Sequence, residues 1–334
     1  MTGFNFGGGS FHLHHVGSAP EPFDALNGGR LAGGQGSHPL HDVRPEELLR
    51  ASDGGPISGQ ITIAGPVVVG SSITGSIALQ VSGLVNARGA ALRLIGLRLD
   101  EERRSEQHHD GRGNLTSSES WVECHGHLFA EDSFTEPAIP ATLTAGASWQ
   151  AQFAIPAPGL GPPTAHLGES IIAWAIETRW DIPLGSDHFL ATYLPVAQSP
   201  DLLRAGVGEQ GGASLEDQLT VGDATITVSS PLPAPAGSDL IMRVRWPSAP
   251  PADRARLELH RRTNAPNGVE GIIASVPVDP VALIGGTDDL KLTVPPGSPP
   301  SFDGAGLEIT YILRVLVDRA FRPDAAIERP VGIY

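Results

Sequence analysis

The sequence Glu-Cys-His-Gly-His, which starts at Glu123, has the residue types of a metal site. Side chains alternate along an extended strand, so Glu123, His125 and His127 would share one face. Carboxylates and imidazoles bind zinc when three or four of them converge. His108 and His109 precede this stretch, and we expect them in a loop that could approach it. Two interpretations stay open: a metal site, or polar residues on the solvent-facing side of an outer strand.

Other reactive side chains form no recognisable catalytic set. Cys124 points away from its neighbour His125 on a regular strand, so the two cannot pair as a thiolate and a base. His12, His14 and His15 could bind a metal, although flexible His-rich segments commonly bind nothing specific. The sequence contains no nucleophile elbow, P-loop, dinucleotide fingerprint or H-E-x-x-H motif. We therefore expect no catalytic residue, no cofactor and no enzyme activity.

Length and composition predict a globular β protein. The chain has 334 residues, enough for about two domains of ordinary size. Hydrophobic residues make up 40% of it, while 41 Gly and 30 Pro favour many turns over long helices. The formal net charge of −15 argues against nucleic acid or an anionic membrane surface as a partner, because both need clustered cations.

Further features bear on the location of the protein. Cys124 is the single cysteine, so no disulfide can form within the chain. The N-terminal residues lack the basic start and apolar core of a signal peptide, and no run of roughly 18 apolar residues could span a membrane. We expect a cytoplasmic protein without membrane insertion. Lys291 is the sole lysine, a composition typical of a GC-rich bacterial genome.

One pattern occurs twice in the chain. An alternating segment ends in Ile-Pro or Val-Pro, a Gly/Pro turn leads to Pro-Pro-Thr or Pro-Pro-Ser, and a long alternating strand ends on Asp. The matching residues lie 137 positions apart: Pro163 and Pro300, Trp174 and Tyr311, and Asp181 and Asp318. Two sets are each expected to share one face of a strand: Ile172, Trp174, Ile176, Thr178 and Trp180, and Ile309, Tyr311, Leu313, Val315 and Val317. The repeat predicts two duplicated domains with one β architecture.

Composition divides the chain into four segments. Residues 1–55 are rich in Gly and His with scattered apolar residues, which predicts a flexible arm, either disordered or loosely docked, that adds little to a core. One or two helical turns are expected within it, from Arg44 to Ala51. Residues 56–197 and 221–334 alternate between apolar and polar positions and predict two β domains. Residues 198–220 show little alternation and predict the linker.

Two strands of the first domain are expected to flank a long connection. The residues from Ala91 to Leu99 alternate as a strand does, and the stretch that begins at Trp121 predicts the returning strand. The residues between them, from Ser105 to Ser120, are polar and contain Gly. They predict a long, mobile hairpin connection.

Several stretches resemble signatures of the arrestin superfamily. In the first half these are "VVVGSSITGSIALQV", "TLTAGASWQAQFAIP" and "LGPPTAHLGESIIAWAIETRWDIP", and in the second half "LKLTVPPGSPPSFDGAGLEITYILRVLVD". The likeness covers roughly residues 57–334, apart from the linker. It implies an all-β fold of two tandem arrestin-like, immunoglobulin-like β-sandwiches after the Gly/His-rich arm, with relatives among bacterial sporulation-control proteins. The Cys-Trp-Cys spacing of true immunoglobulin domains is absent.

The sequence also departs from arrestins. The region from Ile57 to Val81 contains no cation where phosphate-sensing arrestins present lysines, so phosphate recognition is not expected. No Pro-Pro-x-Tyr motif is present. Arg179, Asp181 and Asp318 are candidates for polar contacts between the domains, with local pairing near the strand ends as the alternative.

Taken together, these features predict a non-enzymatic cytoplasmic adaptor or scaffold that binds protein partners through strand edges and loops, with a homo-oligomer as one arrangement. Exposed edges accept a partner's strand through main-chain hydrogen bonds. Two alternatives stay open. One is a metal-binding β-sandwich protein that uses Glu123, His125 and His127, and the other is a structural subunit of a bacterial assembly.

Overall fold

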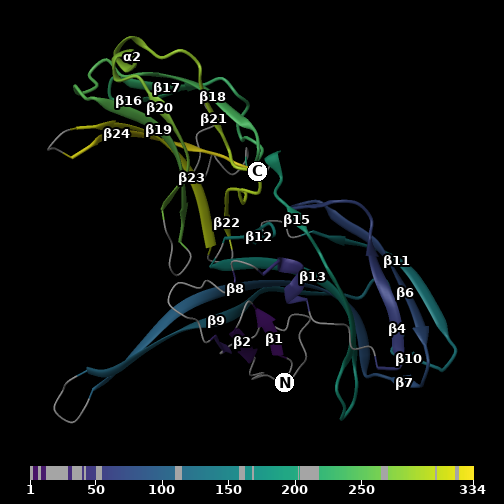
Figure 1. Ribbon diagram of the computed structural model, residues 1–334. Coiled ribbons are helices and arrows are strands. Elements are labelled where there is room, and N and C mark those ends of the chain that lie inside the picture. Colours follow the sequence, from purple (N-terminus) through teal and green to yellow (C-terminus); the bar gives the residue numbers. More distant parts are fainter. Residues whose placement is uncertain are drawn as a thin grey trace. The chain divides into compact units, whose positions relative to one another are not determined.

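The computed structural model describes residues 3–6, 9–12, 29–31, 40, 43–49, 55–109, 115–157, 162–167, 169–201, 203, 218–264, 270–304, 307–319 and 323–334. Most of these residues lie in β-strands (Figure 1), so the expected all-β fold is confirmed. The chain divides into two compact units, residues 1–197 and 198–334.

The first unit contains a large sheet and a smaller one. The large sheet has the order β1-β2-β3-β9-β8-β13-β12, with β14 also paired to β13, and the smaller sheet has the order β11-β6-β4. Two short pairs, β7 with β10 and β5 with β15, complete the unit. The strands are β1 (Gly3–Phe6), β2 (Gly9–His12), β3 (Gly29–Leu31), β4 (Ile57–Ile63), β5 (Val67–Val68), β6 (Ser72–Val81), β7 (Val85–Asn86), β8 (Gly89–His109), β9 (Leu115–Phe134), β10 (Thr142–Leu143), β11 (Ser148–Pro156), β12 (Ala165–His166), β13 (Ser170–Asp181), β14 (His188–Tyr193) and β15 (Val196–Ala197).

The long strand of the first repeat, β13, is buried on both faces from Ser170 to Thr178. Trp174 and Trp180 lie on the face expected from alternation, and both are almost fully buried. Large side chains are accommodated there because Gly96 on β8 pairs with Trp174: a Cβ at Gly96 would lie 2.6 Å from the Phe129 ring and 2.9 Å from the Trp174 ring. The rings of Phe129 and Trp174 meet edge to face at 4.9 Å between centroids.

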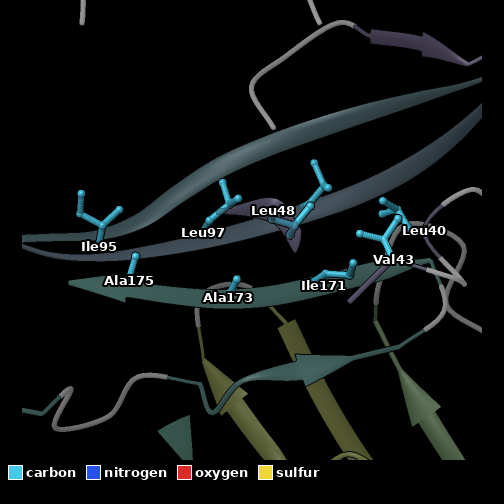
Figure 2. Packing of buried hydrophobic residues seen from close by; sticks show 9 residues of the cluster. Leu40, Val43, Leu48, Ile95, Leu97, Ile171, Ala173 and Ala175 are labelled. Atoms are coloured by element: carbon cyan, nitrogen blue, oxygen red, sulfur yellow. The ribbon is translucent and has the colours of Figure 1, made fainter. Parts of the chain in front are cut away.

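The opposite face of β13 is covered by part of the N-terminal segment (Figure 2). Leu40, Val43 and Leu48 pack on apolar side chains of β8 and β13, which are Ile95, Leu97, Leu99, Ile171, Ala173 and Ala175. The short helix expected here is confirmed as a 3₁₀ turn, η2 (Pro45–Leu48). The prediction that residues 1–55 add little to a core is wrong for these three residues. The physical reason is that β8 and β13 are apolar on both faces, so the second face also needs cover.

Two side chains hold Leu40 in place by its backbone. Its N–H donates to the carboxylate of Glu101, which is 1% exposed, and its carbonyl oxygen accepts from Nε2 of His166 at 2.7 Å. Both backbone groups of a buried residue are therefore satisfied although Leu40 lies in no sheet. His12 lies in β2, whereas His14 and His15 fall outside the described residues.

The expected hairpin connection between Ser105 and Ser120 is present, but its described residues, 105–109 and 115–120, continue the two strands as a paired ladder. β8 and β9 form one long antiparallel hairpin (Figure 1), in which Ser105 pairs with Ser120 and Gln107 pairs with Ser118. Residues 104–107 are exposed, so this part of the hairpin extends beyond the core. Alternation disappears from the sequence because neither face is buried there, while the backbone ladder continues without an apolar face.

The second unit contains a four-stranded sheet, β16-β17-β18-β21, and a five-stranded sheet, β20-β19-β23-β22, in which β24 also pairs with β23. Its long strand, β23, carries the second set of alternating apolar residues, and Ile309, Tyr311 and Leu313 are buried as expected. The elements are β16 (Gln218–Val221), β17 (Ala224–Val228), β18 (Asp239–Arg245), β19 (Arg254–Thr263), β20 (Gly271–Val278), α2 (Pro280–Gly285), β21 (Leu290–Thr293), β22 (Phe302–Gly304), β23 (Leu307–Asp318) and β24 (Ala325–Val331).

The two units repeat one set of hydrogen bonds. Trp174 Nε1 donates to the carbonyl of Pro162 at 2.9 Å, and the Tyr311 hydroxyl donates to the carbonyl of Pro299 at 2.6 Å. Each residue of the second bond lies 137 positions after its counterpart, which is the offset of the sequence repeat. The polar tip of each core aromatic therefore anchors the first proline of the Pro-Pro pair. The two copies of the pattern therefore make the same bond at matching positions of the sequence.

The residue after each Pro-Pro pair is also equivalent. The hydroxyl oxygen of Thr164 accepts from the N–H of Val196 at 3.0 Å, and that of Ser301 accepts from the N–H of Ile333 at 2.9 Å. Both pairs obey the same offset of 137. A side-chain oxygen thus satisfies a backbone donor near the end of each unit, where no ladder would do so.

Candidate protein-binding edge

The smaller sheet of the first unit, β11-β6-β4, contains no ionisable side chain. None of its residues is Asp, Glu, Lys, Arg or His, although the chain carries a formal net charge of −15. Its outward positions are mainly Ser, Thr, Gln and Ala, while its inward positions include buried Ile, Leu and Phe. Another protein can therefore approach this sheet without bringing like charges into contact.

β11 is an edge strand with one open side. It pairs with β6 along its whole length, and no other strand in the described ranges pairs with it. The carbonyl of Ala147 accepts from the N–H of Val81 at 3.0 Å, and the N–H of Ala157 donates to the carbonyl of Ser71, just before β6, at 2.8 Å. The odd-numbered residues between Ala147 and Ala157 therefore direct their backbone groups to β6. The backbone N–H and C=O groups of the even-numbered residues point to the open side; these residues are Ser148, Gln150, Gln152 and Ala154.

The common protections of a sheet edge are missing from β11. Such edges are usually shielded by charged side chains, proline, a bulge or a covering element. The pairing of β11 with β6 has no bulge, and its one proline, Pro156, is its last residue. The other edge of the sheet, β4, lies beside β14. β11 therefore presents a regular row of backbone donors and acceptors that can receive another strand.

Sequence reasoning predicted binding at strand edges but did not identify which edge. A usable signal was present, because residues 54–87 and 137–168 contain no Asp, Glu, Lys or Arg. These two stretches supply all three strands of the smaller sheet. The pairing of β6 with both β4 and β11 is what places the two uncharged stretches side by side.

Of the predicted metal residues, the side chains of His125 and His127 fall within the described parts of the chain. Nε2 of His125 lies 3.3 Å from a carboxylate oxygen of Glu102, an acid on β8 that the sequence did not single out. His127 is exposed, and the side chain of Glu123 falls outside the described parts. Within the described ranges no three His, Cys, Asp or Glu residues gather in a way that could hold a metal.

The predicted approach of His108 or His109 to this strand is wrong. His108 pairs with Ser117, whereas His125 pairs with Asp100. These two positions of β8 are separated by roughly 26 Å at the rise of an extended chain. The two histidines lie in the ladder, not in a loop that could fold back.

Comparison with protein-family models and with curated proteins finds no match for this chain. Among the described residues, no helix has both the length and the apolar character needed to cross a bilayer.

The three residues proposed for contacts between the domains are each paired within their own unit. Arg179 binds Asp187 at 2.9 Å, and Asp181 binds Arg88 at 2.5 Å. In the second unit, Asp318 accepts from Nη1 of Arg256 at 2.5 and 2.6 Å. The local pairing considered from the sequence is therefore present at all three positions. A role between the domains stays a prediction.

A buried ion-pair group in the first unit was not expected from the sequence. Arg93, which is 6% exposed, donates to the fully buried carboxylate of Glu177 and to Glu131 at 2.5 Å. Removing Glu177 would leave a buried guanidinium without its buried partner, which is strongly destabilising, whereas the side chain of Glu131 is 52% exposed and its removal would cost less. The group thus stabilises the pairing of β8 with β13 and β9.

A second group of charges in the second unit comes from β19, β23, β24 and Glu270, the residue just before β20. Arg262 donates to Glu270 at 2.8 Å, and Arg314 lies 2.7 Å from Glu270 and 2.5 Å from Glu328. The hydrogen bond from Arg262 lowers the pKa of Glu270. With its pKa lowered, the carboxylate of Glu270 stays ionised at neutral pH and is unsuited to proton donation.

Proposed function

We propose that this chain is a non-enzymatic cytoplasmic adaptor of the arrestin-like type, built from two tandem β-sandwich domains. The repeated aromatic-to-proline hydrogen bonds support a duplicated architecture. The arrestin-like assignment itself rests on the sequence stretches that resemble that superfamily. The protein binds its partner by adding a strand of the partner to the open side of β11.

The observation that carries this proposal is the uncharged, unprotected edge of β11. Strand addition takes its affinity from main-chain hydrogen bonds, which β11 offers at every second residue. Specificity then comes from side chains of alternate residues, and Trp149 is only half-buried at this edge. A partner that supplies an apolar residue opposite Trp149 would bury that ring, which provides more contact area than an aliphatic side chain.

A photoreactive amino acid at Gln150, introduced in the native host, tests the proposal. Gln60 is the matched control because Gln60 and Gln150 both pair with Ala78, in the same row and on opposite edges of the sheet. We expect an adduct with a different protein from position 150 and none from position 60. Equal labelling from both positions, or no adduct with another protein, would contradict strand addition at β11.

A further inference from the structure

We propose that, without a partner strand, β11 pairs antiparallel with β11 of a second copy of this chain across a twofold axis. The proposal rests on the open edge that also carries the proposed function. Each copy has a net charge of −15, so contact between two copies is opposed least where charge is absent. Among the described sheets of three or more strands, β11-β6-β4 is the one in which no strand carries a charged residue.

The backbone of β11 selects one register for this pairing. With the twofold axis at Ala151, Gln150 faces Gln152 of the second copy and Ser148 faces Ala154. The N–H and C=O groups of these four residues point outward, so each of these groups finds a partner in an antiparallel ladder. Because of the twofold axis, each hydrogen bond from the first copy to the second recurs from the second copy to the first. The open side of β11 is then paired in both copies.

Shifting the register by one residue in either direction leaves hydrogen bonds of the ladder between the two β11 strands unmade. With the axis at Gln152, Ser148 would face Pro156, which has no N–H to donate. With the axis at Gln150, Ala154 would face Gly146, whose N–H already donates to the carbonyl of Val81 at 2.8 Å. The register centred on Ala151 is therefore favoured over a shift in either direction.

The side chains agree with the same register. On the inward side, Trp149 of one copy faces Phe153 of the other, and aromatic pairs are favourable across antiparallel strands. Ala151 lies on the axis, where a small side chain suits the close approach of a pair without hydrogen bonds, with Cα atoms about 4.5 Å apart. On the outward side Gln150 faces Gln152, so their amides can exchange hydrogen bonds.

Sedimentation of the purified full-length chain tests the dimer. We expect a dimer at micromolar concentration that strengthens as salt is raised, because salt screens repulsion between two negative molecules. The double variant Gln150→Lys and Gln152→Lys should weaken association by about tenfold or more, since it places like charges directly opposite each other. The matched control, Gln60→Lys with Thr62→Lys, adds the same charge to the same two rows on β4 and should leave the dimer intact.

Cysteine cross-linking tests the register. In a Cys124→Ser background, Ala151→Cys should give a disulfide-linked dimer on mild oxidation, because paired Cα atoms at the axis are within disulfide reach. Ala154→Cys should not, since the two cysteines would be roughly 20 Å apart along the ladder. Cross-linking through position 154 in place of 151 would overturn the register.

The outcomes separate this inference from the proposed function. A wild-type chain that stays monomeric, or a dimer unaffected by the two edge lysines, overturns the inference even if position 150 captures a different protein. A dimer that dissociates on Gln150→Lys with Gln152→Lys supports the inference. It does so even if no other protein is captured, in which case only the adaptor function fails.

Discussion

Replacing Tyr311 by Phe tests whether the repeated hydrogen bond stabilises the second unit. The Tyr311 ring is fully buried and its hydroxyl donates to Pro299 at 2.6 Å, so the variant leaves a buried carbonyl without this donor while the ring still fills the core. A neutral hydrogen bond contributes about 1 kcal/mol, and an acceptor left unsatisfied in the interior costs about 1–3 kcal/mol. We expect the free energy of unfolding of the second unit to fall by about 1–2 kcal/mol.

Hydrogen exchange with peptide-level mass spectrometry measures this loss in each unit separately. Core amides of the second unit should exchange roughly 5- to 30-fold faster in the variant, while those of the first unit should not change. Tyr334→Phe is the matched control because Tyr334 is 36% exposed. Equal effects of the two variants, or no effect of Tyr311→Phe, would refute the argument.

The stability difference between wild type and Tyr311→Phe should also depend on pH. Burial raises the pKa of Tyr311. The stabilising contribution of its neutral form is complete below the ordinary tyrosine pKa of about 10, and it is lost as pH rises further, because the unfolded chain ionises first. The stability difference between wild type and Tyr311→Phe should therefore shrink above about pH 10. A stability difference that stays constant above about pH 10 would contradict a stabilising role for the neutral Tyr311 hydroxyl.

Two further perturbations test other parts of the fold. Leu48→Ala should lower the free energy of unfolding of the first unit by about 2–3 kcal/mol, because Leu48 is 8% exposed and packs against β8 and β13. The amides of residues 43–49 should also exchange faster with solvent. Unchanged exchange would show that this segment does not depend on the Leu48 contact. Arg262 lowers the pKa of Glu270. The stabilising contribution of the ionised Glu270 is therefore complete above the ordinary glutamate pKa of about 4.3, and it is lost as pH falls through the lowered pKa. Urea unfolding of Glu270→Gln should therefore differ from wild type at neutral pH and converge with it at low pH, whereas the exposed-acid control Glu308→Gln should match wild type throughout.

Pattern alone was sufficient for the duplicated elements. A strand alternates its side chains whatever surrounds it, so the faces of β13 and β23 could be assigned from residue spacing. Pro-Pro restricts the backbone locally, and the aromatic that follows lies at a constant distance in sequence in both copies. These local constraints are why Trp174 and Tyr311 could be matched, and their bonds to Pro162 and Pro299 agree with that match.

Other features depend on residues far apart in the chain, and only the tertiary structure decided them. Leu40 enters the core because it covers an apolar face of β8 and β13, and Glu101, 61 positions later, accepts its N–H. The hairpin of β8 and β9 keeps its ladder beyond the core because backbone pairing continues where no apolar pattern marks it. The edge at β11 exists because β6 pairs with β4 on one side and with β11 on the other, and no further described strand pairs with β11. Propensity and spacing describe one segment at a time, whereas an edge, a covered face or an ion pair is a relation between segments.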